Sequence, residues 1–143
     1  MANYKLNVDQ VGNGDASTAI SDATPLPVVS SPSSSSAVAP TNSAQAAAAA
    51  SKVIKATAGT IYGLSGYNGK TTTQFIQIHN SATLPSDTAV PAFNIIANPL
   101  TNFSVDFGQY GMSFDTGIVV CNSSTSATKT IGSADCQFFG RYK

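Results

Sequence analysis

The stretch that decides the fold is Thr116–Lys143, TGIVVCNSSTSATKTIGSADCQFFGRYK. It contains two apolar runs, Ile118–Cys121 and Cys136–Phe139, joined by small polar residues. Two such runs around a Ser/Thr/Gly-rich connection are typical of paired antiparallel strands. The first run is apolar at consecutive positions, which predicts a central strand covered on both faces. A strand pair alone cannot bury its apolar face in water, so further strands must come from the preceding chain.

The second run alternates in polarity, as a strand with one buried face does. Cys136, Phe138 and Tyr142 fall on one face, and Phe139 breaks the pattern. The clearest alternation in the chain lies at 102–107, where Phe103 and two further apolar residues alternate with polar ones. We expect both segments to place their apolar residues in one common core.

Short apolar segments separated by turn residues continue through the preceding chain. Seven or eight short strands at this spacing predict an all-β fold, an antiparallel β-sandwich or jelly-roll-like domain. Besides the two runs above, the expected strands are 52–57, 60–64, 71–80, 89–97 and 102–107.

Glycine and proline mark the expected connections. Ser65–Lys70 contains Asn68-Gly69, a strong hairpin-turn signal. Pro91, early in its segment, predicts an edge strand or a bulge there. We expect Tyr110 and Phe114, in a glycine-containing loop, to cover one end of the core.

Residues 1–51 differ from the rest and predict an extended N-terminal arm and linker, followed by a β-sandwich domain at 52–143. The arm has two short apolar segments, then a Ser/Pro-rich linker at 30–40, and an alanine run at 42–51 with high helix propensity. Such an arm cannot bury a core of its own, so it is either disordered or ordered by docking on a neighbour, and we expect the second. The expected contact residues are Tyr4, Leu6, Val8, Leu26 and Val28.

The composition excludes several classes of partner. The formal net charge is zero and only 10% of residues are charged, which argues against nucleic acid because phosphate binding needs clustered Lys and Arg. No apolar run approaches the length of a membrane helix, and no N-terminal apolar segment resembles a signal peptide. We therefore expect synthesis in the cytoplasm and no membrane partner. A surface so poor in charge favours a protein that packs among neighbours.

Cys121 and Cys136 allow two interpretations. They could form a disulfide, or they could be two buried thiols in a reducing cytosol, which the compartment favours. Together with His79, the only histidine, they do not form a metal-ligand set. We expect no metal and no cofactor.

No residue pattern predicts catalysis. His79 falls at the end of an expected strand, and no serine and acid pair is spaced to converge on it. Asp106 lies on the polar face of its strand and Asp115 precedes a turn glycine, so we expect solvated or turn-capping roles rather than a carboxylate pair. The chain is therefore predicted not to be an enzyme.

The tyrosines offer an alternative function. Tyr62, Tyr67 and Tyr110 could line a platform for a host-surface glycan, although aromatic residues in small β domains more often complete a core or an interface. The carbohydrate-binding hypothesis stays open at this point.

Several segments together form a further pattern. They are DATPLPV at 22–28, VIKATAGTIYG at 53–63, TGIVV at 116–120, TKT at 128–130 and FFGRY at 138–142. In these strand and turn motifs the chain resembles small virion proteins of tailed bacteriophages, mainly over residues 52–143.

The resemblance implies a non-enzymatic virion structural protein with a β-sandwich fold. Its expected place is the capsid surface, as a decoration protein anchored by the arm; a tail, neck or baseplate protein is the alternative. The implied partners are the major capsid protein or tail and neck proteins, and we expect a homo-oligomer, with a trimer as the first hypothesis.

Overall fold

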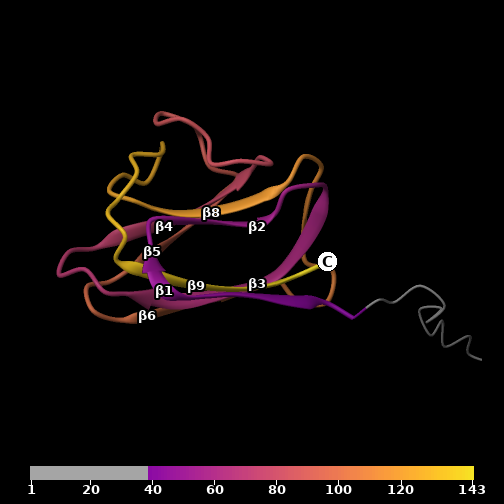
Figure 1. Cartoon of the computed structure of the whole chain (residues 1–143), viewed down its shortest axis with the longest axis horizontal. Coiled ribbons are helices and arrows are strands. Elements are labelled where there is room, and N and C mark those ends of the chain that lie inside the picture. The colour runs from indigo at the N-terminus through magenta and orange to yellow at the C-terminus, as the bar shows by residue number, and fades with distance from the viewer. Residues whose placement is uncertain (1–38) are drawn as a thin grey trace, which may run out of the picture. The chain divides into compact units, whose positions relative to one another are not determined.

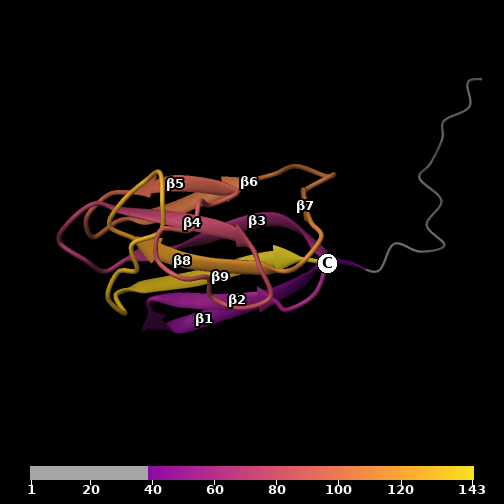
Figure 2. The same cartoon turned by 90° about the horizontal axis from the view of Figure 1, so that it is seen from above.

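Nine β-strands form two antiparallel sheets in the computed structural model, which describes residues 39–143. The sheets lie face to face as two layers with their strands roughly aligned (Figures 1 and 2). The strands are β1 (Thr41–Ala49), β2 (Ser51–Lys55), β3 (Gly59–Asn68), β4 (Gln74–Asn80), β5 (Phe93–Ala97), β6 (Asn102–Asp106), β7 (Met112–Phe114), β8 (Ile118–Ser123) and β9 (Cys136–Tyr142). The predicted all-β sandwich is confirmed.

The strand order explains how the chain closes the sandwich. The five-stranded sheet has the order β1-β9-β3-β6, with β7 also pairing β3, and the four-stranded sheet has the order β2-β8-β4-β5. The chain crosses between the sheets six times, after β1, β2, β3, β5, β7 and β8. These repeated crossings hold the two layers together over one core.

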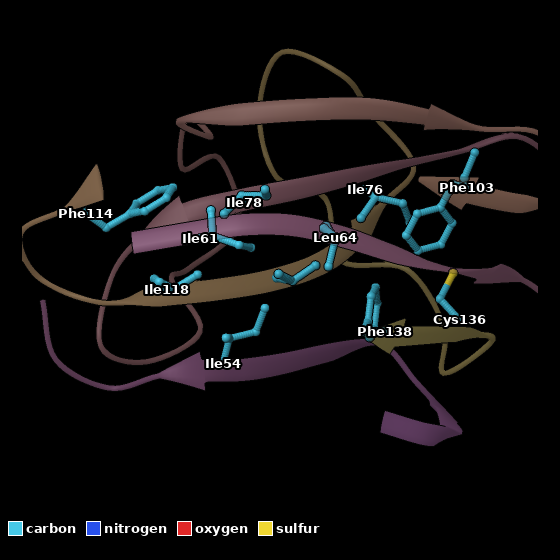
Figure 3. Close-up of a cluster of buried hydrophobic side chains, with 12 residues drawn as sticks. Ile54, Ile61, Leu64, Ile76, Ile78, Phe103, Phe114, Ile118, Cys136 and Phe138 are labelled. Atoms are coloured by element: carbon cyan, nitrogen blue, oxygen red, sulfur yellow. The ribbon is translucent and has the colours of Figure 1, made fainter. Parts of the chain in front are cut away.

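Apolar side chains from both sheets fill the space between the layers (Figure 3). Phe103 and Phe138 pack with their ring centroids 6.4 Å apart. The core cluster comprises Ile54, Ile61, Leu64, Ile76, Ile78, Ala97, Phe103, Phe114, Ile118, Val120, Cys136 and Phe138. The alternation predicted for 102–107 and for the last strand is confirmed, because Phe103, Cys136 and Phe138 all point into this core.

The last 28 residues do form two strands, but the predicted pairing between them is wrong. β8 pairs with β2 and β4 in the four-stranded sheet, whereas β9 pairs with β1 and β3 in the other. The connection 124–135 crosses from one layer to the other instead of making a hairpin. The prediction that β8 is central and covered on both faces is confirmed, since all six of its residues are buried.

The alanine run, whose composition favours a short helix, forms strand β1 instead. β1 pairs antiparallel with β9, from Thr41 opposite Tyr142 to Ala49 opposite Cys136. Helix propensity amounts to less than 1 kcal/mol per residue, and a ten-residue helix is marginal alone. Pairing with β9 satisfies a row of backbone groups that would otherwise be an open edge, so the tertiary partner overrides the local preference.

This strand also corrects the predicted domain boundary. Residues 41–51 belong to the sandwich through β1 and the start of β2, so the domain begins before residue 52. The predicted arm contacts lie outside the described residues; they are Tyr4, Leu6, Val8, Leu26 and Val28.

Two turn predictions have different outcomes. The expected hairpin turn at 65–70 is wrong, because β3 runs on to Asn68 and the chain then crosses to the other sheet. The side chain of Asn68 is buried there and donates to the carbonyl oxygens of Thr72, Ala97 and Asn98. The edge-strand prediction is confirmed, since β5 lies at the edge of its sheet just after Pro91.

Candidate functional site

The outer face of the five-stranded sheet, turned away from the core, is the most distinctive surface. Its side chains form three rows across the strands, defined by the pairing register. The first row is Asn42, Arg141, Gly63 and Asp106; the second is Ala44, Phe139, Ser65 and Ser104; the third is Gln137, Tyr67 and Asn102. Phe139 is the one large apolar side chain in the middle row.

Two hollows on this face meet at Phe139, and together we call them the trough. One hollow, of 340 Å³, lies along the first and second rows. The other, of 280 Å³, lies along the second and third rows, and both are lined by Ser65, Ser104 and Phe139. The trough exists because small residues flank Phe139 on both neighbouring strands, which leaves Phe139 38% exposed.

The polar groups around the trough retain hydrogen-bonding capacity. Within residues 39–143, the side chains of Ser65, Ser104 and Asn102 form no hydrogen bond. The Nε2 of Gln137 donates to the carbonyl oxygen of Ala46 at 2.7 Å, which orients the amide. The Gln137 Oε1 atom is left as an acceptor.

Asp106 and Arg141 stand on opposite sides of Gly63, at one end of the trough. Because Gly63 is the register partner of both, the two charged residues are two strand spacings apart, about 10 Å. Lys129 and Asp87 form an ion pair elsewhere in the domain. Asp106 Oδ1 accepts from the backbone N–H of Gly108, as the predicted solvated and turn-capping role requires.

The structure places Tyr67 at the far end of β3 from Tyr110, whereas Tyr62 lies beside Gly111, the neighbour of Tyr110. Tyr67 lies half-buried in the third row and lines the trough. Tyr110 is 84% exposed in the loop before β7, so the prediction that it covers the core is wrong, whereas Phe114 is buried as predicted. Sequence reasoning missed Phe139 as a site residue; its only signal was the break in alternation.

A second polar cluster lies on the outer face of the four-stranded sheet, beneath loops 81–92 and 124–131. Gln77 Nε2 donates to the carbonyl oxygens of Thr125, Ser126 and Thr128. The loops join each other through the Lys129–Asp87 ion pair and through backbone hydrogen bonds of Lys129 to Thr88 and Ala89. This cover explains why β4 and β8 are buried on both faces.

His79 belongs to this covered cluster and has a structural environment. Its Nε2 lies 3.3 Å from Gln77 Oε1, and its side chain is buried. Burial, with the nearby ammonium of Lys129, lowers the pKa of His79. Asp115 accepts hydrogen bonds from the Asn80 amide, which lowers the pKa of its carboxyl group, and from the hydroxyl group of Thr116 in the turn before β8.

Cys121 and Cys136 are free, buried thiols on opposite sides of the four-stranded sheet. Cys136 points into the core between the sheets, whereas Cys121 shares the face of Gln77, its register partner. Side chains that point to different sides of a sheet cannot be bridged without backbone movement. Of the two interpretations from the sequence, the structure therefore supports buried thiols.

We expect both thiols to be unreactive in the folded protein. Burial raises the pKa of Cys121 from 9.0 to about 11, and burial also raises the pKa of Cys136. At pH 8, a thiol-specific reagent such as dithionitrobenzoate should modify neither cysteine in the native chain and both after denaturation. Rapid modification without denaturant would contradict this prediction.

The same shifts predict a loss of stability at alkaline pH. The folded state favours the neutral Cys121 thiol. The contribution of Cys121 to the free energy of unfolding is therefore fully present below its unfolded pKa near 9, and it is lost as the pH rises toward 11. Unfolding curves at pH 8 and pH 10.5 should show this loss, and Cys121→Ala should reduce the difference between the two curves.

Within residues 39–143, no group of three His, Cys, Asp or Glu side chains is placed to hold a metal ion. The same residues contain no helix of the length and hydrophobicity that a membrane span needs. Searches against protein-family models, curated proteins and solved structures found no match. The resemblance to phage virion proteins therefore stays a prediction.

Proposed function

We propose that this chain is a non-enzymatic structural protein of a tailed-bacteriophage virion, most simply a capsid decoration or head-surface protein. In this role the sandwich is displayed on the particle, and the N-terminal segment anchors it to the major capsid protein. The resemblance of the strand and turn motifs supports the class. The proposed localisation is the virion, after synthesis in the host cytoplasm.

The observation that carries the proposal is the open edge of β1. β1 has nine residues, no charge and no proline, and within the described chain it pairs only with β9. Edge strands in isolated domains are usually blunted by charge, proline, short length or a bulge. The register of β1 shifts between Gln45 and Ala49, which leaves Thr41–Gln45 as its regular part. A long, uncharged edge suits the addition of a strand from a neighbouring subunit.

The segment that leads into β1 supplies a means of anchoring. Its two apolar stretches, at 4–8 and 26–29, have the size of peptides that add to a sheet edge. One such contact is weak alone, but many copies on a lattice act together through avidity. A homo-oligomer, with a trimer as the first hypothesis, follows if the arm of one subunit pairs with the sandwich of the next.

Quantitative mass spectrometry of purified particles tests this proposal. The wild-type chain should be present in many copies per particle, and removal of residues 2–38 should leave a folded protein that no longer joins the particle. Few copies would favour the alternative of a tail, neck or baseplate protein. Absence of the wild-type chain from particles contradicts the virion role, and full occupancy by the truncated chain contradicts the anchor.

A further inference from the structure

We infer that the trough binds a short oligosaccharide that carries little or no charge, such as a segment of a bacterial surface polysaccharide. This binding activity is separate from the proposed virion role and does not rest on it. The ligand would lie across the sheet face, between the Asp106–Arg141 end and the Tyr67 end.

The aromatic part of the argument rests on Phe139. The flat, apolar C–H face of a pyranose ring packs against an aromatic ring, which presents a negative π face to those hydrogens. Ala44 on one side and Ser65 on the other are too short to cover the ring of Phe139, so its surface remains open within the trough. Tyr67 adds a second aromatic side chain to the far hollow.

The polar part rests on the free groups around that ring. Binding sites for small molecules combine apolar surface with a few convergent hydrogen-bonding groups. Here Ser65, Ser104 and Asn102 supply unused hydroxyl and amide groups, and Gln137 supplies an oriented acceptor. Asp106 can accept hydrogen bonds and Arg141 can donate them, so this end of the trough can bind a hydroxyl group either as a donor or as an acceptor.

Charge and size argue against other occupants. One acid and one base leave the trough without net charge, whereas nucleic acid requires clustered cations. Three rows across four strands cover roughly 13 Å by 14 Å, on the order of 200 Å². A stable protein interface buries about 800 Å² per partner, so the trough is too small to be one by itself.

Gly63 provides a way to fill the trough without disturbing the sheet. A Cβ atom on Gly63 has only the Val105 carbonyl oxygen nearby, at 3.4 Å, which is ordinary contact. Valine has a high strand propensity, so Gly63→Val should fold while its side chain occupies the floor between Asp106 and Arg141. Phe139→Ala removes the aromatic surface from the middle row.

The test is a glycan array of bacterial O-antigen and capsular oligosaccharides, probed with the full-length protein, followed by calorimetric titration of the best-bound glycan. Phe139→Ala and Gly63→Val should each weaken binding by about tenfold or more. Ile96→Ala is the matched control, because Ile96 is 63% exposed on the other sheet and should leave affinity unchanged.

Thermal unfolding must first show that each variant is folded. Failure of the wild-type protein to bind any glycan on the array overturns the inference, as does wild-type affinity in both folded trough variants. Binding of nucleic acid instead of glycan, in a parallel titration with a single-stranded oligonucleotide, also overturns it. Both variants should still join particles, so failure of glycan binding and failure of the virion role are separate results.

Discussion

Gly66→Ala is expected to destabilise the domain by about 3 kcal/mol or more, because it forces a side chain into a closed part of the core. A Cβ atom on Gly66 would lie 2.0 Å from the backbone oxygen of Gln137 and 2.4 Å from the Cζ atom of Phe103. The oxygen belongs to the neighbouring strand β9, and Phe103 is held against Phe138. Relief of the clash therefore requires the strands to separate.

Gly63→Ala is the matched control, three residues earlier in the same strand. Its Cβ atom would have no neighbouring atom closer than 3.4 Å. Alanine also loses less backbone conformational entropy on folding than glycine does. We expect unchanged or slightly increased stability. Urea unfolding of the two variants, followed by circular dichroism, should separate them clearly, and equal stabilities would contradict the predicted packing around Gly66.

Removal of residues 2–50 is expected to unfold or severely destabilise the protein, whereas removal of residues 2–38 should not. The longer deletion eliminates β1. The backbone groups of β9 that pair with β1 then lose their partners, and Ala49 no longer packs against the core. It also removes Ala46, the hydrogen-bond acceptor for the Gln137 amide. A loss of several kcal/mol corresponds to a melting temperature lower by more than about 10 °C.

The deletion of residues 2–38 serves as the control, because it leaves β1 and every contact described here in place. Its melting temperature should lie close to that of the full chain. Differential scanning calorimetry of both truncations provides the comparison. If the protein that lacks residues 2–50 melts like the full chain, β1 contributes little to the fold and the alanine run is dispensable.

Local sequence pattern predicted seven of the nine strands and missed β1 and β7. The period of two in 102–107 placed Phe103 in the core, and the continuous apolar run of β8 indicated a strand buried on both faces. Pro91 correctly indicated an edge, because a proline cannot donate a hydrogen bond within a sheet. These signals are local, since they depend on the alternation of side chains along one strand.

Pairing between strands could not be predicted in the same way. Asn68-Gly69 and the Ser/Thr-rich connection at 124–135 are both typical of hairpins, yet each carries the chain from one sheet to the other. The buried amide of Asn68 explains the first case, because its hydrogen bonds tie the crossing to 97–98 rather than closing a two-strand turn. These hydrogen bonds join residues about thirty positions apart in the chain, so no local sequence pattern predicts them.

The trough could not be predicted from the sequence either. Phe139 appeared there as a break in alternation, and Ser65 and Gly63 as parts of a turn and a short strand. Their proximity depends on the register between β9 and β3, which places Ser65 beside Phe139 and Gly63 beside Arg141. A shift of one residue would turn every one of these side chains to the other face.

The sequence by itself determined the all-β class, the faces of the strongest strands and the absence of a charge pattern suited to nucleic acid. Each of these follows from residue type and from spacing along the chain. Only the tertiary structure decided that the alanine run is strand β1, that β8 and β9 lie in different sheets, and that an open trough surrounds Phe139. The physical reason is that backbone pairing and burial between distant segments outweigh local propensities of less than 1 kcal/mol per residue.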